Sequence, residues 1–316
     1  MTTKTIDSSA QESFKTKDAD SYNAVVDYFD RYTERFTRHM PEPMLALANV
    51  GKNARVLDIG TGTGVVALNI VNHIPGKGFV VGIDLSDGML ATATEKAKSL
   101  GLSDNTDFRK MDAENLELED NSFDACLSLY ALRHFPNPDK SIAEIYRVLK
   151  PGARIVAAVG SPPELFSSEG IKSALRHVAS ICRKALGREL NACEFIDALV
   201  EKHIPKSVDR ETAEWVDDHH HGFTGSIEQL VKDAGYEDIH TSWKGQYSII
   251  ESAEDFWLLQ MTFSSVARKR IANASNEQIK NLRTEFDETC NQVLAKGGRL
   301  VYQTGAAIVS ARKPYK

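Results

Sequence analysis

The chain has 316 residues, of which 42% are hydrophobic and 26% are charged, and its formal net charge is −6. These proportions are ordinary for a globular protein, and the negative balance argues against a nucleic-acid partner, which usually requires a basic face. No apolar stretch reaches membrane-spanning length and no apolar signal core follows Met1, so we expect a cytoplasmic protein without a membrane span. The four cysteines form no C-x-x-C pair, as expected for reduced thiols.

The first fifty residues divide into two parts. Residues 1–18 are polar and are expected to form a disordered tail. Residues 19–49 are expected to be helical, because aromatic and aliphatic side chains recur there every three or four positions. They are Tyr22, Val25, Tyr28, Phe29, Tyr32 and Phe36. Such a stripe predicts an apolar face that packs on a core.

A glycine-rich run follows at residues 56–65, which read VLDIGTGTGV. It predicts a strand over 55–59, a tight loop and a helix over 64–73. Glycine allows a ligand to approach the backbone closely, and a helix N-terminus suits polar ligands. A second apolar run, 79–83, ends in Asp84, where a carboxylate is placed to accept hydrogen bonds from ribose hydroxyls. Together these features predict a site for a cofactor that contains a nucleoside.

The remaining core, within residues 50–162, alternates between strand and helix. After the first strand and helix, the expected elements are a strand at 78–83, a helix at 87–101, strands at 105–110 and 123–129, a helix at 139–149 and a strand at 154–160. This alternation predicts a parallel sheet with right-handed crossovers.

The second half interrupts that pattern twice. Residues 163–222 are expected to be a helical insertion without a strand, followed by a core helix and a sixth strand within 223–246. Residues 247–297 are expected to be a second helical insertion, and residues 298–316 to carry the last strand. Both insertions leave near the carboxyl ends of strands, where open α/β sheets bind ligands. We therefore expect a cap that encloses the substrate.

The glycine spacing distinguishes between cofactors. A dinucleotide fingerprint would require Gly or Ala where this chain has Val65 or Leu68. The alternating glycines resemble motif I of the class I S-adenosylmethionine-dependent methyltransferases. Four further segments fit that family in order and spacing: 111–116 (MDAENL), 121–124 (NSFD), 130–136 (YALRHFP) and 145–152 (IYRVLKPG). The resemblance covers about residues 50 to 160, and within the class it is to the ubiquinone/menaquinone-biosynthesis type.

The resemblance implies a Rossmann-like α/β fold, a seven-stranded, mostly parallel sheet with helical cap insertions, and S-adenosyl-L-methionine as the cofactor. In the family pattern Asp58 helps to hold the methionyl amine, Asp84 holds the ribose, and Asp112 and the amide of Ala113 meet the adenine. The same pattern gives Gly60, Thr61, Gly62, Gly64, Leu85, Met89 and Leu129 as further cofactor contacts, with Tyr32 closing over the cofactor.

The acceptor site is less specified. His134 follows the fourth strand, where the methyl must emerge, and is interpreted as a general base or a positioning residue. Tyr130 and Arg133 beside it, with Tyr28 and Trp257, are the expected substrate contacts. We expect methyl transfer to a small, fairly hydrophobic acceptor such as a quinone or a phenol.

Three alternatives remain open. One is C-methylation of a prenyl diphosphate, clamped by the cations of the first insertion: Arg176, Arg183, Lys184 and Arg188. The others are a nicotinamide-dependent oxidoreductase and a cofactor-binding regulator without activity. The run His219-His220-His221 is not expected to bind a metal, because consecutive residues rarely point at one centre. A homodimer is left open.

Overall fold

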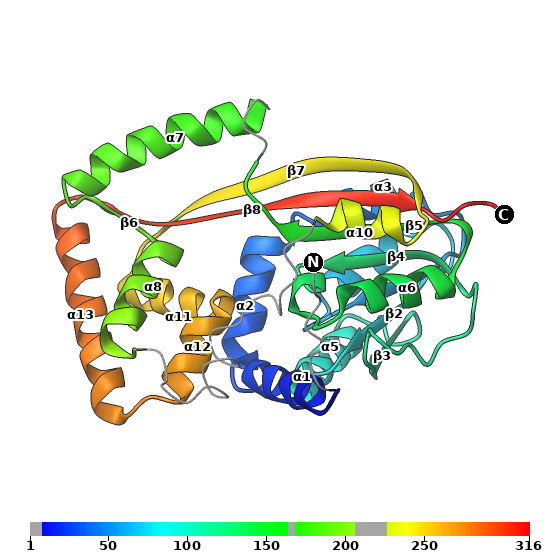
Figure 1. The fold of residues 1–316 in the computed structure, drawn as a ribbon, viewed down its shortest axis with the longest axis horizontal. Coiled ribbons are helices and arrows are strands. Elements are labelled where there is room, and N and C mark those ends of the chain that lie inside the picture. The colour runs from blue at the N-terminus through cyan, green and yellow to red at the C-terminus, as the bar shows by residue number, and fades with distance from the viewer. Residues whose placement is uncertain (1–7, 164–167, 206–225) are drawn as a thin grey trace. The chain divides into compact units, whose positions relative to one another are not determined.

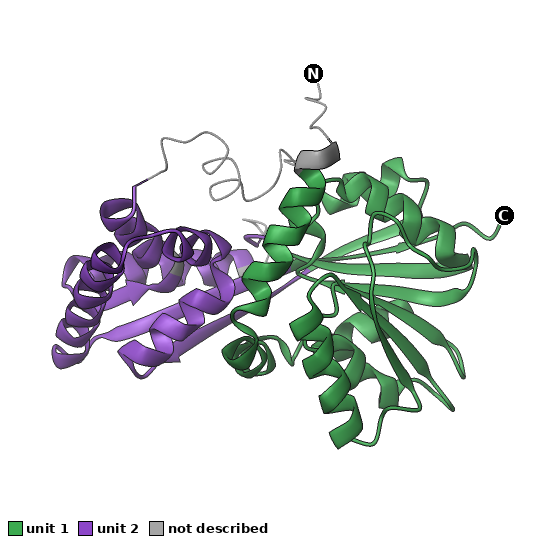
Figure 2. Cartoon of the chain, turned by 90° about the horizontal axis from the view of Figure 1, so that it is seen from below, with its two compact units in different colours: residues 1–159, 220–242, 307–316 green, residues 160–219, 243–306 purple. Residues whose placement is uncertain are grey.

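The computed structural model describes residues 8–163, 168–205 and 226–316 (Figure 1). The chain forms two compact units (Figure 2). Unit 1 comprises residues 1–159, 220–242 and 307–316, and unit 2 comprises residues 160–219 and 243–306. Both segments that the sequence indicates as helical insertions fall largely in unit 2.

Unit 1 is built on a parallel sheet. Its strands are β1 (Arg55–Ile59), β2 (Phe79–Asp84), β3 (Thr106–Lys110), β4 (Phe123–Leu129) and β5 (Leu149–Gly160), in the order β3-β2-β1-β4-β5 with each pair parallel. β8 (Arg299–Arg312) follows β5, and β7 (Glu237–Ile250) pairs with β8. The strand order reverses between β1 and β4, so the ligand crevice is expected outside their carboxyl ends.

Helices complete unit 1, and local sequence fixes where several begin. Ser86 caps α5 (Asp87–Ser99) and Ser226 caps α10 (Ile227–Asp233), each by accepting a bond from a backbone amide of the first turn. Pro138 opens α6 (Pro138–Val148). Unit 1 also contains α3 (Pro41–Ala48), α4 (Val65–Ile70) and the short 3-10 helices η1 (Val71–His73) and η2 (Leu132–His134), in addition to two N-terminal helices. β1, β2, β4, β5, α6 and α10 share one apolar core.

The N-terminal segment corrects the sequence-based prediction. A disordered tail over residues 1–18 is wrong from Ser8 onward, because Ser8–Asn23 form helix α1, followed by α2 (Val26–Thr37). The polar side chains of α1 find partners in unit 1: Lys15 pairs with Asp112 and Glu114, and Gln11 bonds to Asn137. A polar helix is thus held by hydrogen bonds that no apolar periodicity could reveal.

Unit 2 contains α7 (Ser168–Ala185), α8 (Ala192–His203), α11 (Ala253–Phe263), α12 (Ser265–Ala272) and α13 (Asn276–Ala295). Phe195, Phe256 and Trp257 all pack on Phe286 of α13, with ring centroids 5.1 to 5.9 Å apart. The helices of both insertions therefore share one aromatic core.

Two strand predictions in this half are wrong. The first insertion does contain a strand, β6 (Glu189–Asn191), which pairs in parallel with β8 and makes eight strands among the described residues instead of seven. Three residues are too short to show an alternating pattern. β7 also extends to Ile250, beyond the bound of 246 expected for the sixth strand, whereas β8 lies within the expected residues 298–316. A Cβ at Gly305 would lie 2.1 Å from the ring of Trp243, so glycine is needed where the indole crosses the strands.

Candidate functional site

The loop after β1 has the backbone that alternating glycines permit. Gly60, Gly62 and Gly64 have φ of 66°, 53° and 83°, in the left-handed region. A Cβ at Gly60 would lie 2.3 Å from the Cβ of Ala131, so the loops after β1 and β4 approach at the backbone level. The amide of Thr61 donates to the carbonyl of Ile83 at 2.9 Å. The loop is therefore fixed to the ends of both neighbouring strands.

Asp58 lies buried at the base of this loop. Its Oδ2 accepts bonds from the Thr61 hydroxyl at 2.7 Å and from the amide of Ala67 at 3.3 Å. Its Oδ1 is buried and accepts no bond from the described residues. Burial raises the pKa of Asp58 from 3.8 to about 7, against the lowering effect of these two bonds. An unused, buried acceptor with a raised pKa suits a cationic ligand group, such as the amine that the sequence assigns to Asp58.

Asp84 ties the second strand to the glycine loop. Its Oδ2 accepts from the amide of Gly62 at 2.9 Å, and its Oδ1 accepts from the amide of Ser86 at 3.0 Å. Burial raises the pKa of Asp84, while its backbone hydrogen bonds lower it. Each carboxylate oxygen keeps a second lone pair, so both could still accept from a diol. Leu85 follows directly, and Met89 is buried in the first turn of α5.

Asp112 has a partner that the sequence did not suggest. Its Oδ2 accepts from Lys15 Nζ of α1 at 2.7 Å, and its Oδ1 accepts from the amide of Glu114 at 2.9 Å. Lys15 also donates to Glu114 at 2.9 Å, and Glu114 accepts from the amide of Asn137 at 2.8 Å. The neighbouring Ala113 is buried. The loops after β3 and β4 are thus joined to α1 beside the predicted adenine position.

An aromatic chain links the glycine loop to the predicted catalytic histidine. A Cβ at Gly62 would lie 3.8 Å from the ring of Phe29. The Phe29 ring is 5.7 Å from that of Tyr22, edge to face, and the Tyr22 ring is 6.1 Å from that of His134. Sequence reasoning placed Phe29 and Tyr22 only in the stripe of core residues. Their positions in that stripe do not distinguish a residue beside the loop from one in the core.

Two further α2 aromatics are predicted ligand contacts. Tyr32 is buried and stacks on Phe36 with ring centroids 6.3 Å apart. Its contact with the cofactor stays a prediction. Tyr28 is half-buried and its role as a substrate contact stays a prediction.

The residues after β4 form a compact group. Leu129 ends the strand and Tyr130 follows with φ of 62°, a conformation that a bulky residue adopts only where its surroundings require it. The amide of Tyr130 donates to Ala158 of β5 at 2.8 Å. Arg133, in η2, has a buried Nε that donates to no described residue, and His134 is half-buried. The segment after β4 thus combines a strained backbone at Tyr130 with an unused buried donor at Arg133.

Other sequence candidates belong to unit 2, and their roles stay predictions. Trp257 belongs to unit 2, where its ring packs on Phe286 and under the guanidinium of Arg283. In the same unit Arg183 pairs with Glu189 and Lys184 pairs with Glu194. Among the described residues no group of three or more potential metal ligands occurs, and the histidine run 219–221 lies outside them.

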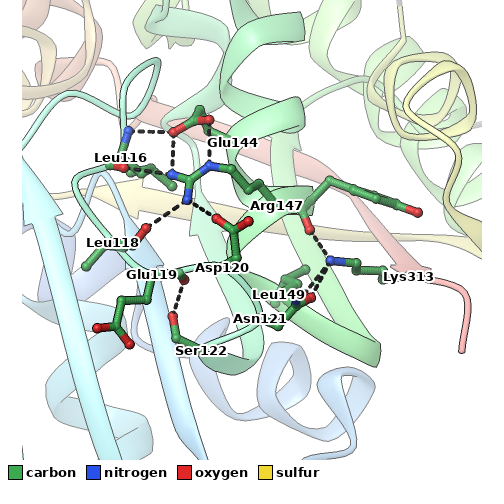
Figure 3. Close-up of polar contacts among 11 residues, drawn as sticks. Leu116, Leu118, Glu119, Asp120, Asn121, Ser122, Glu144, Arg147, Leu149 and Lys313 are labelled. Atoms are coloured by element: carbon green, nitrogen blue, oxygen red, sulfur yellow. Dashed lines mark hydrogen bonds and ion pairs between the residues drawn. The ribbon is translucent and has the colours of Figure 1, made fainter. Parts of the chain in front are cut away.

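The segment 145–152 contributes hydrogen bonds that hold neighbouring parts of the fold together (Figure 3). Arg147 donates to both carboxylate oxygens of Glu144, at 2.9 and 2.7 Å, and to Asp120 at 2.6 Å. It also donates to the carbonyls of Leu116 and Leu118, at 2.7 and 2.8 Å. The guanidinium lowers the pKa of Glu144. Arg147 therefore fastens the stretch that follows β3, and thereby Asp112, to helix α6.

Comparison with known proteins finds relatives of this part of the chain. The family model described as a methyltransferase domain matches residues 56–152. A demethylmenaquinone methyltransferase of Lactiplantibacillus plantarum is 35% identical over 127 residues, which is 40% of this chain and 54% of that protein. A ubiquinone/menaquinone biosynthesis C-methyltransferase of Brucella abortus is 41% identical over 109 residues, 34% of this chain and 40% of that protein. The chain thus spans about half of these relatives or less.

Solved structures agree on the fold. A protein of Bacillus halodurans superposes with a TM-score of 0.51 at 21% identity, covering 87% of this chain and 99% of its own. Residues 56–152 thus match a methyltransferase domain, lie on a Rossmann-like sheet, and are similar to methyltransferases of the ubiquinone/menaquinone-biosynthesis branch. The described residues include no helix that is long and apolar enough to cross a membrane.

Proposed function

We propose that the protein transfers a methyl group from S-adenosylmethionine to a small, fairly hydrophobic acceptor. The observation that carries the proposal is a set of three carboxylates at the carboxyl ends of neighbouring strands. Asp58 is the second-last residue of β1, Asp84 ends β2 and bonds to the glycine loop, and Asp112 follows β3. S-adenosylmethionine brings a sulfonium and an ammonium, which carboxylates attract. Of the three, Asp58 distinguishes the cofactors, because it would meet the methionyl ammonium, whereas a carboxylate there would repel the pyrophosphate of a nicotinamide dinucleotide.

In this proposal, different residues hold different parts of the cofactor. Asp58, with its unused Oδ1, would accept from the methionyl amine, and Asp84 would accept from the ribose hydroxyls. Asp112 and the amide of Ala113 would meet the adenine. When bound, the cofactor supplies a methyl that its sulfonium already activates. The protein then has to align the acceptor with the methyl carbon and the sulfur, and to exclude water.

Residues after β4 are proposed to face the acceptor. Tyr130 and Arg133 would shape its position, and His134 would remove a proton from an acceptor that arrives protonated. The strained backbone of Tyr130 and the unused Arg133 Nε support this assignment. The names of the two relatives favour an aromatic, quinone-like acceptor. The ion pairs of Arg183 and Lys184 with glutamates give no support to a diphosphate clamp.

The test is turnover with methyl-labelled S-adenosylmethionine and a panel of reduced quinones, phenols, amines and prenyl diphosphates, with mass detection of products. We expect a methylated quinol or phenol as the product. An Arg133→Met variant should reduce turnover and leave the affinity for S-adenosylhomocysteine unchanged. A product from a prenyl diphosphate alone would contradict the proposed acceptor class, and the absence of any product despite cofactor binding would favour the regulator.

A further inference from the structure

Glu114 is a buried carboxylate at which three segments of unit 1 meet. Only 5% of its side chain is exposed. Its Oε1 accepts from the backbone amide of Asn137 at 2.8 Å, and its Oε2 accepts from Asn137 Nδ2 and from Lys15 Nζ, both at 2.9 Å. The donors thus come from α1 and from the residue before α6, while Glu114 itself lies in the loop after β3. Loss of a donor to a buried carboxylate is costly, so these bonds hold the three segments together.

Asn137 bonds to Glu114 instead of capping its own helix. It is the N-cap residue of α6, where an asparagine side chain usually accepts from a backbone amide of the first turn. The Asn137 side chain makes no such bond. Its Nδ2 donates to Glu114 and to Gln11 Oε1 of α1, at 2.9 and 3.0 Å, and its Oδ1 accepts from Gln11 at 3.4 Å. The side chain therefore joins the loops after β3 and β4, at the expense of an ordinary helix cap.

The connection from Asn137 back to His134 is short and stiff. Pro136 has a restricted φ, and Phe135 before it is extended, with φ of −82° and ψ of 134°. The amide of His134 donates to the carbonyl of Ala131 at 2.8 Å, which closes the turn on the other side. A displacement of Asn137 would therefore displace His134 as well.

Glu114 is also bonded to the proposed adenine contact. Its amide donates to Asp112 Oδ1 at 2.9 Å, and the ammonium of Lys15 bridges the two carboxylates. One turn of the chain thus carries the residue proposed to meet the adenine and the residue that holds Asn137. We propose that Glu114 is a positioning residue that fixes the segment 130–137 relative to the adenine-binding loop, a role that rests on the function proposed above. Glu114 acts through Asn137 and touches neither the cofactor nor the acceptor.

The first test compares Glu114→Gln with Glu117→Gln, the matched control at an exposed position of the same loop. A glutamine at 114 keeps the size of the side chain but offers one acceptor oxygen where three donors converge. With the acceptor that the wild-type chain methylates, kcat should fall about tenfold or more, because a small misplacement of reacting groups is costly. Affinity for S-adenosylhomocysteine should stay close to that of the wild type, because Asp112 keeps its bond to Lys15.

A second variant guards against a simple folding defect. Asn137→Ser removes the Nδ2 donor to Glu114 and supplies a side chain that can cap α6 in the ordinary way. It should therefore stay folded, as its melting temperature will report, and should show the same loss of kcat without loss of S-adenosylhomocysteine affinity.

A further readout does not depend on turnover. In a chain labelled with nitrogen-15 histidine, the imidazole signals of His134 report its surroundings in the free protein. They should shift in Glu114→Gln and Asn137→Ser and stay in place in Glu117→Gln. Unchanged His134 signals, unchanged kcat, or a loss of cofactor affinity as large as the loss of kcat would overturn this role of Glu114. A wild-type chain that methylates no acceptor would instead contradict the proposed function, while the His134 signals would still decide whether Glu114 positions that segment.

Discussion

Asp58 combines burial, an unused oxygen and a pKa raised to about 7. A cationic amine beside it favours the ionised carboxylate, so ligand affinity should depend on whether Asp58 is already charged. We predict that the affinity for S-adenosylhomocysteine falls as the pH drops below about 7, by up to about tenfold per pH unit. Calorimetry in buffers with different ionisation enthalpies should show proton release on binding. A pH dependence that survives in Asp58→Asn would contradict this role.

The raised pKa of Asp58 also affects the stability of the free protein, and its effect changes with pH in the opposite direction to ligand affinity. Because the folded-state pKa of Asp58 lies above its ordinary 3.8, the folded protein binds this proton more tightly than the unfolded chain does. The resulting stabilisation is fully present below pH 3.8 and is lost as the pH rises through about 7. Ligand binding and stability of the free protein therefore respond to Asp58 in opposite directions.

Asp84 gives a second prediction. Asp84→Asn keeps the size of the side chain but removes the charge that strengthens its bonds to a ribose diol, so affinity for S-adenosylhomocysteine should fall by roughly 1.5–3 kcal/mol. Asp87→Asn is the control, because Asp87 lies three residues along the chain, is exposed and pairs with Lys110. Titration calorimetry on both variants checks this. Equal affinities in Asp84→Asn and wild type would remove Asp84 from the ribose site.

For single residues, the sequence was most informative where a polar side chain lies at the end of a strand. Asp58 and Asp84 bond to residues of the glycine loop, and Asp112 bonds within the loop after β3. Their cofactor contacts, which the family resemblance implies, stay predictions. Lys15, Tyr22 and Phe29 were missed, because each lies far from those motifs in sequence and its type alone suggests a solvated or core position. Their relation to the site depends on how α1 and α2 dock, which apolar periodicity does not report.

Among the elements, α1 offers the next prediction. It packs against α5 and is held by Lys15, whose two charge-assisted bonds join Asp112 and Glu114. Lys15→Ala should raise the hydrogen-exchange rate of residues 8–23 about tenfold or more, because local opening costs less without these bonds. Glu12→Ala is the control, because Glu12 is an exposed residue of the same helix. Unchanged exchange in Lys15→Ala would mean that α1 is held by its other contacts.

Arg147, in the last turn of helix α6, is predicted to stabilise the fold. Arg147→Met removes the donor that joins Glu144, Asp120 and two backbone carbonyls, so the free energy of unfolding should fall by about 1–3 kcal/mol. Urea denaturation measures it, with Lys140→Met, at an exposed position of the same helix, as the control. If Arg147→Met unfolds at the wild-type midpoint, the network is only a surface arrangement.

Strands were predicted correctly where their local sequence pattern was strong and missed where it was weak. β4 was expected over 123–129 and lies there, since its apolar run is bounded by clear turn residues. β6 was missed because three residues carry no period, and β7 extends to Ile250, past the expected bound of 246. Glycine at 305 leaves room for the ring of Trp243, a tertiary contact that sequence periodicity does not reveal.

For the whole molecule, we propose that the division into two units is also a division of chemistry. Every residue that we assign to the cofactor, and the group after β4, lies in unit 1. Unit 2 contains the helices of both insertions. In this proposal unit 2 acts on the acceptor and leaves cofactor affinity to unit 1.

The central claim is that unit 1 binds S-adenosylmethionine in preference to a dinucleotide. Titration calorimetry of the full chain with S-adenosylhomocysteine and with NAD tests it most directly. The account predicts micromolar binding of S-adenosylhomocysteine, on the order of −8 kcal/mol, and no measurable binding of NAD. Binding of NAD at that strength, with no response to S-adenosylhomocysteine, would contradict the proposed function.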